Sequence, residues 1–329
     1  MTSLALISIP YNSFGTWILL LLMVVGIALL YFGGDYLTQG ASGLALSLRI
    51  NPIVVGLTVV SIATSMPELL TSLIAVFKGK SDLAMGNIVG SNLANIGLIF
   101  GIGALVFPIG IQRRLIRVEH PVLMAVTLLF FFFSLSGSIE RYEGIILLVI
   151  MVVAVTLLVR FARSGNGVPV EGVEDPGSVS KSLIFVALGS LLLAGGASVL
   201  VDSSIEVAGR FGVSEALIAV TMVAIGTSLP ELAATIVAAA RKEADLIAGN
   251  IIGSNFFNIV LIGGAVSVIK PIGVSPMFFT FQLPMVLVAT ALCWILSGLG
   301  KNMTRKDGVI LLTFYAVVIG IIIQQEIVG

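Results

Sequence analysis

One unit occurs twice in this chain, without gaps. The segment TSMPELL at residues 64–70 returns as TSLPELA at residues 227–233, an offset of 163 residues. Over the 44 positions of residues 58–101, 22 residues are identical to the residue 163 positions later. Most of these identities are polar or small residues in apolar surroundings. The chain must therefore fold as two related units, each with an acidic residue inside an apolar stretch.

The composition predicts an integral membrane protein. Of the 329 residues, 58% are hydrophobic and only 10% are charged, whereas soluble domains carry about 25% charged residues. The net charge is zero, which gives no indication of a nucleic-acid partner. Cys293 is the only cysteine, so neither an internal disulfide nor a cysteine metal site can form. No feature of the sequence requires an obligate protein partner.

Apolar stretches long enough to cross a bilayer recur along the chain. We predict ten spans, at residues 16–42, 52–77, 82–106, 118–136, 142–162, 181–208, 214–240, 245–269, 276–298 and 307–325. Between the fifth and sixth spans lies a stretch rich in glycine, proline and acidic residues, which is typical of a linker. The prediction is an all-α integral membrane fold with a first five-helix half at residues 1–163, a linker at 164–180 and a second five-helix half at 181–329.

Basic residues predict how the chain is oriented in a cell membrane. With ten spans, twelve of the 17 Lys and Arg residues fall in loops on one side and five on the other. The richer side is expected to be cytoplasmic, together with the linker, and both termini are expected to be extracellular. Because each half has an odd number of spans, the second half enters the membrane upside down. Inverted repeats of this kind are typical of secondary transporters, with the site near the middle of the membrane.

The repeated segment of the second span places several oxygen-bearing side chains on one helical face. Ser61, Thr64, Ser65 and Glu68 are spaced i, i+3, i+4 and i+7. Their counterparts in the seventh span are Ala224, Thr227, Ser228 and Glu231. A proline precedes each glutamate and is expected to kink the helix, because it lacks an amide hydrogen and clashes with the carbonyl four residues back. The freed carbonyls would then face a cavity.

The next helix of each half adds a polar stripe. Within GNIVGSNLANI, Asn87, Ser91 and Asn95 are spaced i, i+4 and i+8. The second copy, GNIIGSNFFNI, repeats them as Asn250, Ser254 and Asn258. The predicted site thus combines two carboxylates with hydroxyls, amides and carbonyls, and contains no imidazole or thiolate. Such hard oxygen donors suit Ca²⁺ and Na⁺ better than Zn²⁺ or Cu²⁺.

The charge of the site indicates exchange. Two ionised glutamates carry a charge of minus two, which one Ca²⁺ or two Na⁺ would neutralise. A carboxylate in the middle of the membrane without a counter-ion costs at least about 2.5 kcal/mol. An empty site is therefore penalised, as an obligatory exchanger requires. Ca²⁺ and Na⁺ are the expected transported ions, and no cofactor is expected.

The paired TS-x-PE and GN-x-x-GSN-x-x-N segments resemble the two alpha repeats of the cation/Ca²⁺ exchanger superfamily, most closely those of prokaryotic Na⁺/Ca²⁺ exchangers. The resemblance covers the whole predicted layout. It implies that Glu68 and Glu231 are the central Ca²⁺ ligands and that Thr64 and Thr227 offer backbone carbonyls. It further implies Na⁺ ligands among the hydroxyls of Ser65, Ser228, Ser91 and Ser254, an amide at Asn95, and carbonyls at Ser61 and Ala224.

One position of the resemblance separates branches of the superfamily. Asn258 stands where some relatives, notably K⁺-dependent exchangers, carry Asp, so an amide here argues against K⁺ co-transport. The H⁺/Ca²⁺ branch of plants and fungi places its glutamates in a GNA-type motif, whereas TS-x-P precedes each glutamate in this chain. The resemblance therefore implies a Na⁺/Ca²⁺ antiporter that exports Ca²⁺ by alternating access.

Two other functions stay open as alternatives. An H⁺/Ca²⁺ antiporter would use the same carboxylates but would be driven by a pH gradient. A cation channel would need a continuous polar path with weak sites, whereas buried carboxylates on kinked helices favour tight, occluded binding. An enzyme is not expected, because the repeated segments contain no nucleophile beside a base.

Overall fold

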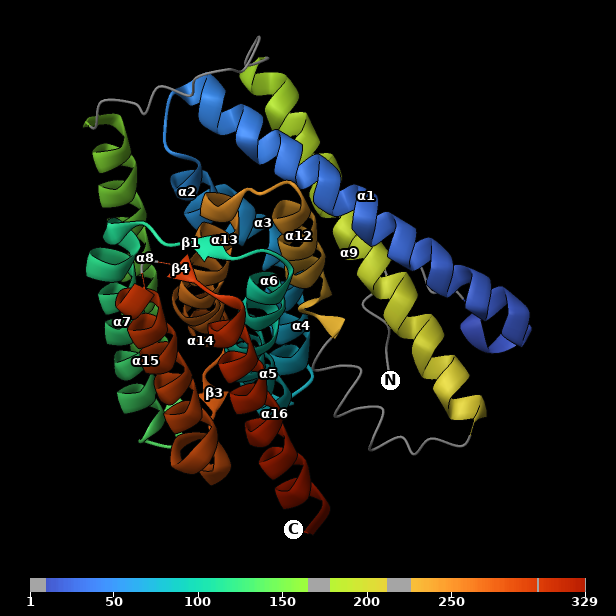
Figure 1. The fold of residues 1–329 in the computed structure, drawn as a ribbon. Coiled ribbons are helices and arrows are strands. Elements are labelled where there is room, and N and C mark those ends of the chain that lie inside the picture. The colour runs from blue at the N-terminus through green and yellow to red at the C-terminus, as the bar shows by residue number, and fades with distance from the viewer. Residues whose placement is uncertain (1–9, 165–177, 212–225, 301, 329) are drawn as a thin grey trace.

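Helices make up nearly the whole of the structure (Figure 1). It is a computed structural model that describes residues 10–164, 178–211, 226–300 and 302–328. Of the predicted linker at 164–180, residues 165–177 lie outside this description. So do residues 212–225, which include the first part of the predicted seventh span and the predicted site residue Ala224.

The first half of the chain runs through seventeen described elements or fewer per membrane layer in a simple order, with short breaks inside several spans. In chain order they are η1 (Tyr11–Ser13), α1 (Thr16–Leu48), α2 (Pro52–Val55), η2 (Gly56–Val60), α3 (Ser61–Thr64), α4 (Met66–Phe77), α5 (Ser81–Leu93), η3 (Ala94–Ile99), α6 (Phe100–Val106), β1 (Ile109–Gly110), η4 (Leu115–Glu119), α7 (His120–Ser134), β2 (Ser138–Ile139) and α8 (Arg141–Ser164).

 The opening count in this paragraph is wrong and should be disregarded: the described part of the first half has the fourteen elements just named.

The second half repeats much of this order at the same offset. Its described elements are α9 (Val179–Arg210), α12 (Leu229–Ala240), α13 (Ala244–Phe257), η6 (Asn258–Gly263), α14 (Gly264–Ile269), β3 (Ile272–Gly273), η7 (Phe278–Gln282), α15 (Leu283–Gly300), β4 (Asn302–Met303) and α16 (Arg305–Val328). Helices α1 and α9 begin 163 residues apart, as do β1 and β3, and η4 and η7. The repetition in the sequence is therefore accompanied by a repetition of local structure.

The apolar helices agree with a multi-pass membrane protein. Within the described residues, eight helices are long and apolar enough to cross a membrane, and a bent pair, Pro52–Thr64 with Met66–Phe77, makes a ninth. Most bounds lie within a few residues of the predicted spans. The predicted first span at 16–42 is too short, because α1 continues to Leu48 through small and polar residues that resemble a loop in sequence. Of the predicted span at 214–240, helix α12 is described.

Two composite helices form the centre of the bundle. In Ser81–Val106 and in Ala244–Ile269, 78% of the most apolar window is buried, against 6% in Arg141–Ala162 and 17% in Arg305–Gln325. The outer helices thus present apolar side chains to the surroundings, as expected where lipid is the solvent. The central helices carry the polar stripes that the sequence predicts. Their burial means that these polar residues face protein rather than lipid.

Helices α1 and α9 form a long antiparallel pair that crosses the bundle at an angle (Figure 1). Glycines let the two backbones approach closely. A methyl group on Gly33 would lie 2.7 Å from the Leu193 nitrogen, and one on Gly189 would lie 2.5 Å from the Leu37 nitrogen. The same contact recurs one heptad away, where a methyl group on Gly26 would lie 2.9 Å from the Leu200 nitrogen.

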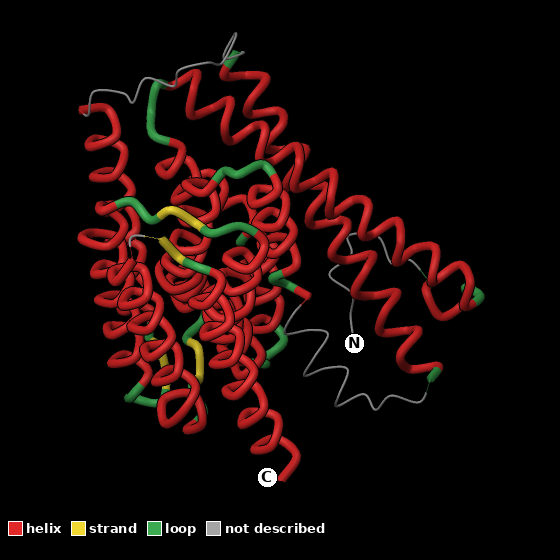
Figure 2. The backbone as a smooth tube through the Cα atoms, in the orientation of Figure 1, coloured by secondary structure: helices red, strands yellow, loops and turns green. Residues whose placement is uncertain are grey.

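Two short strand pairs lie at opposite ends of the helix bundle (Figure 2). Strand β1 pairs with β4, with Ile109 opposite Met303. Strand β2 pairs with β3, with Ile139 opposite Ile272. Both pairs are antiparallel and each joins one half of the chain to the other. They tie the loops of the two halves together at each end.

The close approach of α1 and α9 gives a prediction about stability. Gly189→Ala should lower the melting temperature of the detergent-solubilised protein by several degrees, because the added methyl group overpacks the interface at a cost of about 1–3 kcal/mol. Gly195→Ala is the matched control, since a methyl group there meets nothing within 4 Å and the gain in helix propensity is the same. Equal melting temperatures for the two variants would contradict this packing.

Candidate ion-binding site

Both repeated segments break their helix at the same serine. Helix α3 ends at Thr64, Ser65 has φ −85° and ψ 3°, and α4 begins at Met66. In the second copy Ser228 has φ −92° and ψ 6°, and α12 begins directly after it. A proline follows at the start of each new helix, where its missing amide hydrogen does no harm. The predicted kink is confirmed in the first copy, where the two helices are bent by 41°.

The two glutamates stand in the first turns of the helices that start at these breaks. Glu68 and Glu231 are each only 1% exposed. Within the described residues neither carboxylate oxygen of Glu68 has a hydrogen-bond partner. Glu231 accepts a hydrogen bond from the Ser65 hydroxyl at 3.4 Å through Oε1, while its Oε2 has no partner. The N-terminal ends of α4 and α12 favour negative charge at these positions.

The two carboxylates belong to one site. Although they are far apart in sequence, Glu68 and Glu231 are close enough for their charges to interact. Two buried like charges repel each other, and burial adds the cost of leaving water. A cation between them would relieve both penalties. The three carboxylate oxygens without partners are available to it.

Hydroxyl and amide groups connect the two copies across the site. The Thr64 hydroxyl donates to Asn250 Oδ1 at 3.3 Å, and the Thr227 hydroxyl donates to Asn87 Oδ1 at 3.2 Å. Adding or subtracting 163 converts one bond into the other. Each broken helix is thus bound to the central helix of the opposite half. Neither half could complete this arrangement alone.

The remaining hydroxyls extend the same polar cluster. Ser228 lies 3.4 Å from Ser91, and Ser254 lies 3.4 Å from Thr64, measured between hydroxyl oxygens. The Ser61 hydroxyl donates to the Gly56 carbonyl at 2.7 Å and to the Asn250 carbonyl at 3.0 Å. These side chains are all buried. The structure therefore brings the predicted serines and threonines together around the two breaks.

Asn95 and Asn258 lie where the central helices change to π-helical geometry. Asn95 falls in η3 and Asn258 opens η6. Both side chains are buried, and within the described residues neither amide has a hydrogen-bond partner. Element η3 packs against α12, and η6 packs against α4, so each asparagine is carried by an element that contacts the helix of one glutamate. Such π-helical turns often occur at functional sites.

Sequence reasoning left two asparagines out of the predicted ligand set. Asn87 and Asn250 hold the threonines of the opposite copy, and Asn87 also donates to the Glu68 carbonyl and to Ser72, both at 2.9 Å. Their place in the polar stripes was the available signal. The π-helical turns had no such signal in the sequence. Ala224, the remaining predicted residue, lies outside the described residues.

The donors gathered here are oxygens with few charges. Within the described part of the chain, no three His, Cys, Asp or Glu side chains gather into a group that could hold a metal ion. The site instead combines two carboxylates with hydroxyl and amide oxygens. This donor chemistry fits Ca²⁺ and Na⁺, which accept several neutral oxygens around one or two carboxylates.

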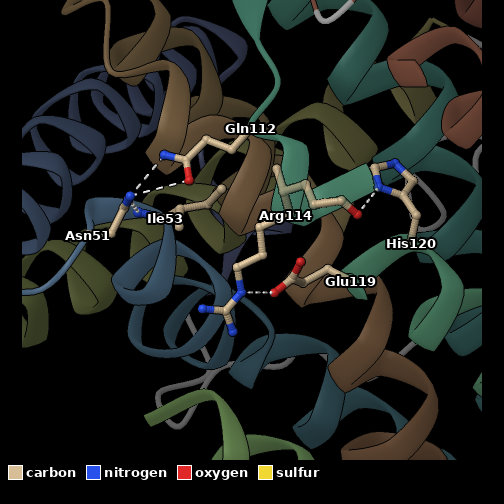
Figure 3. A network of polar contacts seen from close by, with 7 residues as sticks. Asn51, Ile53, Gln112, Arg114, Glu119 and His120 are labelled. Carbon is tan, nitrogen blue, oxygen red and sulfur yellow. Dashed lines mark hydrogen bonds and ion pairs between the residues drawn. The ribbon is translucent and has the colours of Figure 1, made fainter. Parts of the chain in front are cut away.

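A separate polar network lies near one end of the central helices (Figure 3). Asn51 caps α2 by accepting from the Ile53 nitrogen at 3.0 Å, and its side chain pairs with Gln112 at 3.3 Å. Gln112 also donates to Asp245 at 2.7 Å, in the first turn of α13. Arg114 forms an ion pair with Glu119 at 2.8 Å. This network holds loops and helix ends and contributes no side chain to the glutamate site.

Comparisons with known proteins agree with this geometry. A family described as sodium/calcium exchanger protein matches residues 18–160 and 181–324. The chain is 37% identical to CaxA of Alkalimonas amylolytica, covering 88% of this chain and 94% of that protein. It is 29% identical to the sodium/calcium exchanger MaX1 of Methanosarcina acetivorans, covering 90% and 95%. A solved structure of the sodium-calcium exchanger NCX_Mj, soaked with Na⁺ and Sr²⁺, has a TM-score of 0.82 at 26% identity and covers 93% of this chain and 99% of that one.

The site predicts stabilisation by cations. Adding Ca²⁺ or Na⁺ to protein kept in choline buffer with a chelator should raise its melting temperature. A ligand at 100 times its Kd stabilises the native state by about 2.7 kcal/mol. Glu68→Gln should lose most of this increase because it removes one of the two charges. Glu206→Gln is the control, since Glu206 pairs with Arg210 on the surface of α9. An equal increase in all three proteins would argue against binding at this site.

Proposed function

Because the chain belongs to the sodium/calcium exchanger protein family, we propose that it exports Ca²⁺ in exchange for Na⁺ that enters down its gradient. Members of this family are exchangers rather than enzymes, and the chain is a multi-pass membrane protein that acts as a cation/Ca²⁺ antiporter. The proposal adds the coupling ion and the direction. Its main support is the pair of buried glutamates surrounded by neutral oxygens.

The proposed architecture is ten spans in two inverted five-helix halves. The halves are residues 1–163 and 181–329, joined by a cytoplasmic linker at 164–180, with both termini extracellular. Three observations support the inversion. The Thr64–Asn250 and Thr227–Asn87 bonds exchange under the offset. The β1–β4 and β2–β3 pairs exchange in the same way. Helices α8 and α16 extend beyond the bundle at opposite ends (Figure 1).

The proposed roles of the site residues follow from their donors. Glu68 and Glu231 bind Ca²⁺ between them, with backbone carbonyls from Thr64 and Thr227. The remaining proposed ligands are hydroxyls, amides and carbonyls that serve Na⁺ when it replaces Ca²⁺, namely Ser65, Ser228, Ser91, Ser254, Asn95, Asn258, Ser61 and Ala224. One Ca²⁺ and two Na⁺ neutralise the same pair of carboxylates. The two ions therefore compete for one site, as exchange requires.

The proposed motion is a displacement of the α1–α9 pair against the rest of the bundle. The glycine contacts make these two helices one closely packed unit. The pair also crosses the other helices at an angle (Figure 1). Its displacement would expose the site first on one side of the membrane and then on the other. Occupation by Ca²⁺ or Na⁺ removes the charge that would otherwise oppose this step.

The coupling ion can be tested in vesicles loaded with the purified protein. An imposed Na⁺ gradient should drive ⁴⁵Ca²⁺ uptake, whereas a pH gradient alone should not. Glu68→Gln and Glu231→Gln should each lower the flux by roughly 100-fold, because losing one charge of a buried ion contact costs about 3 kcal/mol. Asp82→Asn is the matched control, since Asp82 is exposed at the start of α5. Uptake driven by the pH gradient would identify an H⁺/Ca²⁺ antiporter instead.

A second prediction concerns K⁺. Replacing K⁺ by choline on both sides should leave Na⁺-driven Ca²⁺ uptake unchanged, because Asn258 supplies a neutral amide rather than a third carboxylate. The same measurement on Asn258→Asp provides the comparison, since it adds the charge that K⁺-dependent relatives carry at the matching position. A loss of flux from the unaltered protein in choline would contradict the proposed independence from K⁺.

A further inference from the structure

The two central asparagines are identical in sequence but differ in their bonds. Asn87 uses its whole amide, because Nδ2 donates to Ser72 and to the Glu68 carbonyl while Oδ1 accepts from Thr227. The Oδ1 of Asn250 likewise accepts from Thr64. Within the described residues, however, the Asn250 Nδ2 atom has no partner. The counterpart of the Asn87–Ser72 bond is therefore missing in the second half.

The residue that could complete that bond is Thr235, 163 positions after Ser72. Its hydroxyl is 1% exposed and also has no partner within the described residues. A small cavity of about 10 Å³ is lined by both Thr235 and Asn250. A cavity of roughly 10–15 Å³ is the minimum that holds one water molecule. Leaving a buried polar group unpaired costs about 1–3 kcal/mol, so both groups favour a polar occupant.

The cavity lies between the glutamate site and the end of the bundle that carries Arg241. Its other walls include Thr38 and Ala41 of α1, and Ala238, one turn beyond Thr235 on α12. Helix α12 runs from Glu231 past these residues to Arg241. One wall of the cavity thus belongs to the α1–α9 pair, and the wall opposite belongs to the bundle.

Polar contacts close the same end of the bundle over this cavity. Arg241 forms an ion pair with Asp35 of α1. The Ser42 hydroxyl of α1 donates to Glu243 at 3.1 Å. Both contacts join α1 to the turn between α12 and α13. They must break if α1 moves away from that turn.

We propose that this cavity is the access point to the glutamate site from the Arg241 side, where one water molecule bridges Asn250 and Thr235 between ion passages. The water replaces the direct bond that Asn87 and Ser72 make in the other half. When α1 moves, the wall formed by Thr38 and Ala41 withdraws and the ion passes between Thr235 and Asn250. This inference rests on the proposed exchange function, because it requires an ion path from each side.

The test uses cysteine accessibility, since Cys293 is the only native cysteine and is buried. In a Cys293→Ser background, Thr235→Cys and Ala238→Cys are exposed to a membrane-impermeant methanethiosulfonate reagent in right-side-out and inside-out vesicles during Ca²⁺ exchange. Both cysteines should react from the Arg241 side, and Ca²⁺ flux should be lost as they react. Ala238→Cys keeps the test valid if Thr235→Cys does not fold.

Matched controls fix the side and the specificity. Lys306→Cys, at an exposed position near the start of α16, reports the side on which Arg241 is expected. Ser72→Cys and Ala75→Cys are the counterparts in the first half and should react from the opposite side. Reaction of Thr235→Cys and Ala238→Cys only from that opposite side, or from neither side while flux continues, would overturn the inference. Labelling does not depend on the coupling ion, so a failure of Na⁺ coupling alone would leave this result distinct.

Discussion

Two carboxylates buried in the middle of an apolar bundle impose most of the features of this structure. Glu68 and Glu231 need surroundings that tolerate negative charge, and the chain provides them by starting a helix just before each one. The serine breaks that precede these starts add hydroxyl groups to the same region. The polar helices that carry the surrounding amides must then be shielded from lipid, which explains why α5 and α13 lie at the centre while α8 and α16 lie outside.

Duplication solves a problem that one half could not. Thr64 needs an acceptor inside the membrane, and it finds one in Asn250 of the other half. Thr227 finds the equivalent acceptor in Asn87. An isolated half would leave these groups unpaired in an apolar environment, where satisfying them is costly. The polar residues of the repeat therefore specify the assembly of the two halves as well as the chemistry of the site.

Sequence alone predicted the parts of the fold that depend on strong local signals. Pro67 indicated the break that the structure has at Ser65, and the apolar stretches indicated the spans. The π-helical turns at Asn95 and Asn258 could not be predicted, because one extra residue in a turn leaves the pattern of apolar residues almost unchanged. The strand pair between Ile109 and Met303 depends on a contact between distant loops. Burial also hid the roles of Asn87 and Asn250, which depend on partners from the other half.

The difference between Asn87 and Asn250 has a consequence for the proposed exchange cycle. If both asparagines bonded their helix directly, as Asn87 bonds Ser72, the site would be closed from both sides and no ion could leave. If both bonds were absent, a path could open on both sides at once and the gradients would dissipate. A carrier made of two similar halves must therefore hold them in different states at any moment. Identical residues with unequal bonds meet this condition, because either half can adopt the bonding of the other at little cost in free energy.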